Sequence, residues 1–234
     1  MNNKNILIVG ASSGIGLALA TQVKQAGANL FTVSRTSNAF LTRESAQHWV
    51  ADVTQNAVFQ PLPNELHGVV YCPGSITLKP FHRLTDTEIR ADFELNVWGA
   101  VKVLQSVYPN LKRSGGSVVL FSTVAAGMGM GYHASVAMAK SALEGLAKSL
   151  AAEWAAHNIR VNVIAPSLTD TPLAASLLSS PEKREAAAKR HPLGRVGMPE
   201  DMAAAAVFLL SGASGWITGQ VLHVDGGMSS VKML

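Results

Sequence analysis

Short apolar runs alternate with longer segments of helical length along the chain. Runs such as Ile6–Val9 and Val118–Phe121 are nearly continuous, which is typical of strands buried on both faces. The predicted strands are Asn5–Val9, Asn29–Ser34, His48–Ala51, Gly68–Cys72, Ser117–Phe121, Arg160–Ala165 and Val221–Val224. The predicted helices are Gly14–Ala26, Thr85–Leu111, Ser135–His157 and Pro199–Ser211. This alternation predicts an α/β fold, a doubly wound parallel sheet of about seven strands with helices on both faces.

No repeat, low-complexity stretch or linker divides this alternation, so we expect a single domain over residues 1–234. The segment 167–197 departs from the pattern. It holds two short helical patches, which are broken by Pro172, Pro181 and Pro192. We therefore interpret 167–197 as an excursion from the sheet that resembles a lid.

Composition narrows the class of protein. With 48% hydrophobic and 15% charged residues, a chain of 234 residues is long enough for one sizeable core and is not intrinsically disordered. Cys72 is the single cysteine, which excludes an intramolecular disulfide and favours a reducing compartment. The first residues lack the apolar core of a signal peptide, and no apolar run approaches the roughly 18 residues of a membrane span. We expect a cytoplasmic protein that does not bind membranes.

The charge and the spacing of the histidines argue against nucleic acid and against a bound metal as partners. The net charge is +4, and the positive residues are dispersed along the chain, which favours a small anionic ligand over nucleic acid. The seven histidines show no paired ligand spacing, so we expect no metal site.

A glycine-rich turn joins the first strand to the first helix. Its residues are Gly10, Ala11, Ser12, Ser13, Gly14, Ile15 and Gly16. Glycines at this place let the backbone approach a pyrophosphate, which the free amides at the helix start can hold. The second strand ends in Ser34 and Arg35, without the carboxylate that would repel a 2′-phosphate. This favours NADP(H) over NAD(H), unless Arg35 is simply an exposed arginine without a partner.

Further motifs follow in order and resemble the short-chain dehydrogenase/reductase family over nearly the whole chain. They are the spacing Gly10-x-x-x-Gly14-x-Gly16, Asp52-Val53, Pro73-Gly74, Asn96-Val97-Trp98-Gly99, Arg160 to Pro166, Gly194 to Asp201, Ile217 to Gln220 and Val224 to Gly227. The resemblance implies a Rossmann fold and hydride transfer between a nicotinamide and a carbonyl or alcohol. It implies cofactor contacts at Gly10, Ser12, Ser13, Gly14, Ile15, Gly16, Ser34, Arg35, Asp52, Val53, Pro73, Gly74, Lys140, Pro166, Thr169 and Thr171. Pro73-Gly74 resembles the family's Asn-Ala-Gly segment, but Tyr71-Cys72-Pro73 stand where that segment usually begins with polar residues.

The active-site motif departs from the family pattern. The resemblance implies that Lys140 binds the nicotinamide ribose, that Thr123 takes the place of the serine that holds the substrate oxygen, and that Asn96 supports a proton relay. Four residues before Lys140, where the family has the tyrosine that donates or accepts the proton, this chain has Val136.

Five substitutes for the missing tyrosine remain open. Residues three or four apart share a helix face, so Tyr132 or His133 can reach the position of Val136 if the helix starts early. Of these two we place Tyr132 among the catalytic candidates. A hydroxyl of Ser122 or Thr123, or water, is the remaining alternative.

Three hypotheses about function follow. The first is an NADP(H)-dependent oxidoreductase with an atypical proton donor, which acts on a small carbonyl, alcohol or activated enoyl substrate. The second is a nucleotide-binding pseudoenzyme or sensor with little turnover, and the third is a non-redox lyase or epimerase.

The predicted helices Thr85–Leu111 and Ser135–His157 are rich in small and apolar residues. In the resembling family such helices pack between subunits, so we expect a homo-oligomer, with a tetramer favoured.

Overall fold

Seven parallel strands form one sheet in the order β3-β2-β1-β4-β5-β6-β7. The computed structural model describes residues 1–55 and 61–232. The strands are β1 Asn5–Val9, β2 Asn29–Ser34, β3 Gln47–Val50, β4 Gly68–Tyr71, β5 Gly116–Phe121, β6 Ile159–Pro166 and β7 Val221–Val224. The α-helices are α1 Gly14–Gln25, α2 Ala39–Glu44, α3 Asp86–Phe93, α4 Gly99–Ser114, α5 Ala134–Trp154, α6 Pro181–Ala188 and α7 Pro199–Leu210. The predicted doubly wound α/β fold is confirmed.

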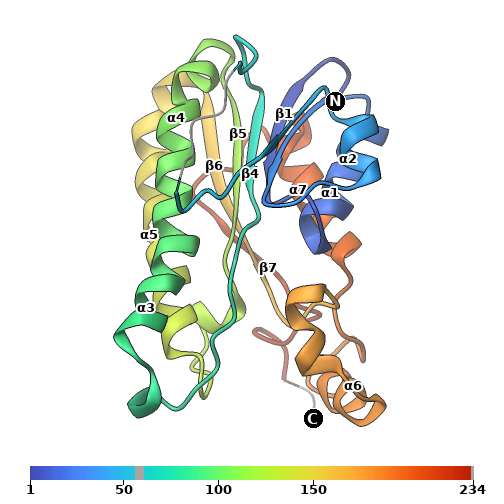
Figure 1. The fold of residues 1–234 in the computed structure, drawn as a ribbon, viewed down its shortest axis with the longest axis vertical. Coiled ribbons are helices and arrows are strands. Elements are labelled where there is room, and N and C mark those ends of the chain that lie inside the picture. The colour runs from blue at the N-terminus through green and yellow to red at the C-terminus, as the bar shows by residue number, and fades with distance from the viewer. Residues whose placement is uncertain (56–60, 233–234) are drawn as a thin grey trace.

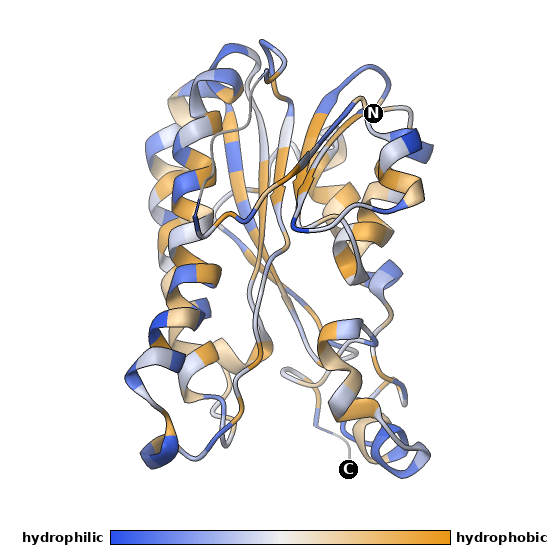
Figure 2. Ribbon diagram, in the orientation of Figure 1, coloured by the Kyte–Doolittle hydropathy of each residue, from blue (hydrophilic) through white to orange (hydrophobic). Residues whose placement is uncertain are grey.

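Helices cover both faces of the sheet, and each face has its own apolar core (Figure 1). One core packs α4 and α5 against alternate residues of the central strands, among them Leu7 and Val118. The other packs α1 and α7 against the residues in between, among them Ile8 and Val119. Because both faces are buried, the strands need continuous apolar runs, and the hydropathy colouring shows apolar residues on the helix sides that face the sheet (Figure 2).

The long helix predicted from Thr85 to Leu111 is interrupted by a π-helical turn, Glu94–Trp98, between α3 and α4. The start is well specified, because Thr85 and Glu88 form a capping box at the first turn of α3. Within the π-helical turn, the buried Asn96 side chain donates a hydrogen bond of 2.8 Å to the backbone carbonyl of Asp92. Such turns often mark functional positions in helices.

The carboxyl ends of the strands lie at one end of the molecule, where the loops and α6 gather (Figure 1). The strand order reverses between β1 and β4, and ligands of doubly wound sheets bind in the crevice at this point. The segment 167–197 forms a closed excursion here, because a parallel bridge pairs Thr169 with Gly197 at its base. Along the described ranges, no helix is both long and apolar enough to cross a membrane.

Candidate active site

A cleft at the carboxyl ends of β1, β2 and β4 brings together most of the residues that the sequence assigns to the cofactor. Its lining includes Gly10, Ser12, Ser13, Gly14, Ile15, Gly16, Ser34, Arg35, Asp52, Val53, Pro73, Gly74 and Thr171. The remaining three, Lys140, Pro166 and Thr169, line an adjoining cavity.

Two glycines of the turn, Gly10 and Gly16, are packed so closely that a side chain does not fit there. A Cβ on Gly16 would lie 2.1 Å from the carbonyl oxygen of Gly10. Gly10 itself has a φ of +83° and would place a Cβ 3.0 Å from Cδ of Pro73. The Ser13 side chain makes no capping hydrogen bond to α1, and the first turn of α1 holds no acidic residue. This is the open, positive helix start that suits a pyrophosphate.

The end of β2 offers a guanidinium to an anionic group. Arg35 is exposed on the cleft wall and makes no ion pair with any residue that the structure describes. The neighbouring Ser34 hydroxyl donates to the carbonyl of Thr36 at 2.7 Å. After the neighbouring strand β3, Asp52 accepts hydrogen bonds from the backbone amide and the hydroxyl of Thr54, at 2.9 and 2.8 Å, and these bonds, with a smaller contribution from the charge of Arg35, lower the pKa of its carboxyl. Arg35 therefore remains available to a ligand.

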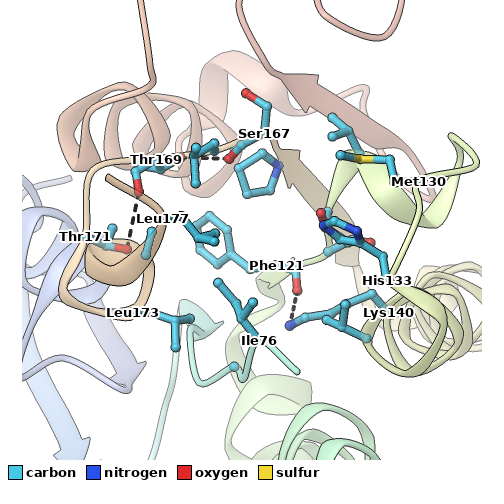
Figure 3. Close-up of a pocket in the computed structure, with 18 of the residues that line it drawn as sticks. Ile76, Phe121, Met130, His133, Lys140, Ser167, Thr169, Thr171, Leu173 and Leu177 are labelled. Atoms are coloured by element: carbon cyan, nitrogen blue, oxygen red, sulfur yellow. Dashed lines mark hydrogen bonds between the residues drawn. The ribbon is translucent and has the colours of Figure 1, made fainter. Parts of the chain in front are cut away.

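A second cavity of about 300 Å³ adjoins the cleft and shares part of its wall. Figure 3 shows Met130, His133 and Lys140 on one side, and Leu173 and Leu177 of the excursion on the other. Most lining residues are apolar, with Ile76, Leu78, Phe121 and Val136 among them. The polar ones are Ser75, Ser122, Thr123, His133, Lys140, Ser167, Thr169, Thr171, Arg190 and His191. The cavity therefore suits a largely apolar ligand with few polar groups.

Lys140 stands where the cleft and the cavity meet. Its ammonium donates a hydrogen bond of 2.7 Å to the carbonyl of Phe121, and only 6% of the residue is exposed. A Cβ on Gly74, which lines both spaces, would lie 3.5 Å from Nζ of Lys140. Burial lowers the pKa of this ammonium to about 8, with the nearby Asp92 carboxylate opposing the shift.

Val136 lies one helical turn before Lys140 on α5 and forms part of the cavity wall. The two side chains that precede it in the sequence are placed differently. Tyr132 has a φ of +68° in the loop before α5, is 64% exposed and lines neither space. His133 lines the cavity, and its Nδ1 lies 2.7 Å from the carbonyl of Gly131. Since a carbonyl only accepts, Nδ1 carries a proton and the neutral ring offers an acceptor at Nε2.

Two neighbouring hydroxyls follow β5. The Ser122 hydroxyl donates to Oε1 of Glu144 at 2.5 Å, so its proton is engaged. Thr123 Oγ1 accepts from the amide of Ala125 at 3.3 Å, which leaves its own proton free to meet a ligand in the cavity. Of the two, Thr123 is the one able to donate to a substrate oxygen.

Asn96 is fully buried and lies behind the cavity wall. Its Nδ2 donates to the Ser75 hydroxyl at 2.9 Å as well as to the carbonyl of Asp92. Its Oδ1 has no hydrogen-bond partner within the described part of the chain and would lie 3.5 Å from a Cβ on Gly74. A buried orphan acceptor beside the junction of cleft and cavity fits a site that is completed by a bound group.

Sequence analysis missed a cluster beside this asparagine. Asp92, Ser75 and Ser135 are joined by hydrogen bonds, and Ser75 lines the cavity. A local signal exists, because Asp92 precedes Asn96 by four positions on the same helix. The Asp92–Ser135 contact joins positions 43 apart, for which a single sequence gives no indication. In the described ranges, no group of three or more His, Cys, Asp or Glu residues is arranged to hold a metal ion.

Comparison with known proteins places the chain among reductases and dehydrogenases. Residues 10–229 match the profile of the family described as enoyl-(acyl carrier protein) reductase. A tropinone reductase homologue from Arabidopsis thaliana is 33% identical over 98% of this chain and 94% of its own length.

Two solved structures share the fold over nearly the whole chain. A short-chain type dehydrogenase/reductase from Mycobacterium ulcerans has 31% identity and a TM-score of 0.87, covering 98% of this chain and 90% of its own. A gluconate 5-dehydrogenase from Burkholderia cenocepacia, in complex with NADP and tartrate, has 28% identity and a TM-score of 0.92, covering 99% and 97%.

Proposed function

Because this chain belongs to the short-chain dehydrogenase/reductase family, we propose that it is an NADP(H)-dependent oxidoreductase of a small, largely apolar carbonyl, alcohol or activated enoyl substrate. The observation that carries this proposal is the continuity of two spaces. A cleft lined by the glycine-rich turn adjoins a largely apolar cavity, and Lys140 lies where the two meet. A dinucleotide that lay along the cleft would present its nicotinamide to the cavity.

The residues at the site fit such a cofactor, which would supply or accept the hydride. The amides at the start of α1 would hold the pyrophosphate, and Arg35 would bind a 2′-phosphate. Lys140 would donate to the ribose hydroxyls, as the family resemblance implies. Pro166, Thr169 and Thr171 would flank the nicotinamide end. The preference for NADP(H) rests on Arg35 and agrees with the NADP that the Burkholderia cenocepacia enzyme holds.

The substrate side of the site has a hydroxyl but no phenol. Thr123 would donate a hydrogen bond to the substrate oxygen, since its proton is free. We propose that Val136 occupies the place of the family's tyrosine, so the proton must come from another group. Tyr132 is an unfavourable candidate because it is exposed outside the cavity, whereas His133 lines it.

A turnover screen tests the proposed function. NADPH oxidation is followed with a panel of apolar ketones headed by acetophenone and with enoyl thioesters, while the affinity for NADPH is measured separately by fluorescence. We expect turnover with at least one member of the panel.

Val136 also favours one alternative, a nucleotide-binding protein with little turnover. Tight NADPH binding without turnover across the panel would support that alternative. If a product forms only when the cofactor is present, and the redox state of the cofactor shows no net change, the reaction is a non-redox one.

A further inference from the structure

A buried carboxylate behind the cavity wall collects three hydroxyl groups. Asp92, at the end of α3, is 1% exposed. It accepts hydrogen bonds from the hydroxyls of Ser75 and Ser135, both at 2.5 Å, and from that of Thr77 at 3.1 Å. The donors come from the segment after β4 and from the first turn of α5, so the carboxylate joins three parts of the chain.

Ser75 connects this carboxylate to the cavity. Its hydroxyl donates a hydrogen bond to Oδ1 of Asp92. One of the two lone pairs of the hydroxyl oxygen accepts a hydrogen bond from Nδ2 of Asn96 at 2.9 Å. The second lone pair remains, and Ser75 lines the cavity. An alcohol in the cavity can donate to this lone pair, which would complete a chain of hydrogen bonds from substrate to Asp92.

We propose that Ser75 is a catalytic residue that passes the substrate's proton to Asp92, and that this pair replaces the missing phenol. The inference rests on the proposed function. In alcohol oxidation the substrate O–H proton moves to Oγ of Ser75 while the Ser75 proton moves to Oδ1 of Asp92. The C–H electron pair leaves as hydride to the nicotinamide dinucleotide, and a C=O bond forms. Asp92 ends as a carboxylic acid, and reduction of a carbonyl is the reverse.

The geometry favours this pair over His133. The position of His133 depends on the exposed loop before α5, where its Nδ1 contacts the carbonyl of Gly131. Ser75 is instead held from two sides, by Asp92 and by Asn96. The hydroxyl of Ser75 is within hydrogen-bond reach of Oδ1 of Asp92, which is the geometry that proton transfer between them requires.

The charged surroundings of Asp92 are simple in the described part of the chain. Lys140 of α5 is the cation that interacts with it electrostatically. Cys72, after β4, stays neutral in any ordinary assay because burial raises the pKa of its thiol to about 12. Lys140 is therefore a titratable group whose charge acts on Asp92, and His133 and His191 are further titratable groups that line the cavity.

Two matched variants separate catalysis from packing. Ser75→Ala and Ser135→Ala each remove one hydroxyl at 2.5 Å from the same carboxylate, but only Ser75 lines the cavity. General acid–base catalysis typically contributes about 10²–10⁴-fold, so we expect Ser75→Ala to lower kcat by about 10²-fold or more. Ser135→Ala should retain kcat within a few fold. The affinity for NADPH should stay unchanged in both.

The isosteric Asp92→Asn variant gives a pH readout for Asp92, which acts on the substrate through Ser75. In the unmutated protein, the rate of 1-phenylethanol oxidation with NADP should be measured as a function of pH, and we expect a profile with an acidic and an alkaline limb. Asp92→Asn should lose this acidic limb together with about 10²-fold in kcat, and should keep the alkaline limb that Lys140 causes. A merely structural role would lower activity without removing the limb.

A spectroscopic readout is independent of turnover. The infrared difference spectrum between the unmutated protein and Asp92→Asn isolates the carboxylate band of Asp92, and this band should be shifted in Ser75→Ala. An unshifted band in Ser75→Ala would overturn the proposal, as would full activity of this variant. A loss of about 10²-fold in His133→Asn with Ser75→Ala unaffected would assign the proton to His133. Absence of turnover across the whole panel in the unmutated protein would overturn the proposed function, and the infrared result would still decide the contact.

Discussion

Replacing Arg35 by alanine should remove most of the preference for NADPH over NADH. The guanidinium is exposed on the wall of the cleft and is unpaired among the described residues, so it is free to bind a 2′-phosphate. A hydrogen bond to a charged group contributes about 1.5–3 kcal/mol, and solvent screening at an exposed site places Arg35 at the lower end. Since about 1.4 kcal/mol is tenfold in affinity, the ratio of the two dissociation constants should change by about tenfold.

Asp52 adds to the expected loss. Its carboxylate lies in the same cleft, and the pKa of this group is lowered, so it is ionised at neutral pH. Without Arg35 this negative charge faces a 2′-phosphate unopposed, which disfavours NADPH but leaves NADH nearly unaffected. The preference of the unmutated protein should also weaken with salt, because the Debye length is about 10 Å at 0.1 M and shrinks to about 3 Å at 1 M.

Fluorescence titration with both cofactors at two salt concentrations measures these effects. Arg43→Ala is the matched control, since Arg43 is an arginine of the neighbouring helix α2 that already pairs with Glu44 and lies outside the cleft lining. Its affinity ratio should equal that of the unmutated protein. Equal binding of NADH and NADPH by the unmutated protein would refute the role assigned to Arg35.

Four further predictions follow from the site and the fold. Gly16→Ala should abolish cofactor binding in calorimetry, because its Cβ would lie 2.1 Å from a backbone oxygen, and a Kd like that of the unmutated protein would contradict this. Cofactor affinity should fall as the pH rises through about 8, where Lys140 loses its proton, and the pH dependence should vanish in Lys140→Met; a flat profile in the unmutated protein would exclude the ribose role. Tyr132→Phe should leave kcat unchanged, since this side chain is 64% exposed outside the cavity, whereas a loss of about 10²-fold would make Tyr132 the proton donor. Light scattering should report a tetramer formed through α4 and α5, and a monomer of 24.6 kDa at micromolar concentration would contradict this.

The sequence predicts the sheet better than it predicts the helices between the strands. β1 was predicted with the bounds that the structure has, because a strand buried on both faces must be a continuous apolar run. The helix α2 was not predicted, since six residues capped by Asn38 are too few to show a period. The π-helical turn Glu94–Trp98 was also missed, because one extra residue in a helical turn leaves the apolar periodicity on either side intact.

In the candidate site, residues placed by local backbone shape could be predicted from the sequence, and residues brought together by distant contacts could not. The turn from Gly10 to Gly16 lies in the cleft because its spacing encodes a local backbone shape. The position of Tyr132 was left open by the sequence, since its place depends on a loop backbone with a positive φ. The bond between Asp92 and Ser135 joins α3 to α5, so only the packing of the two helices shows it.

The most direct test of the central claim is the transfer of the hydride itself. The protein is incubated with NADPH that carries deuterium at the transferable C4 position and with the ketone or enoyl thioester that consumes NADPH fastest in the screen. Mass spectrometry of the product should find one deuterium on the reduced carbon, with one NADPH oxidised per product molecule. A product without deuterium, or a cofactor that is bound but recovered unchanged from every substrate tried, would contradict the assignment of this chain as an oxidoreductase.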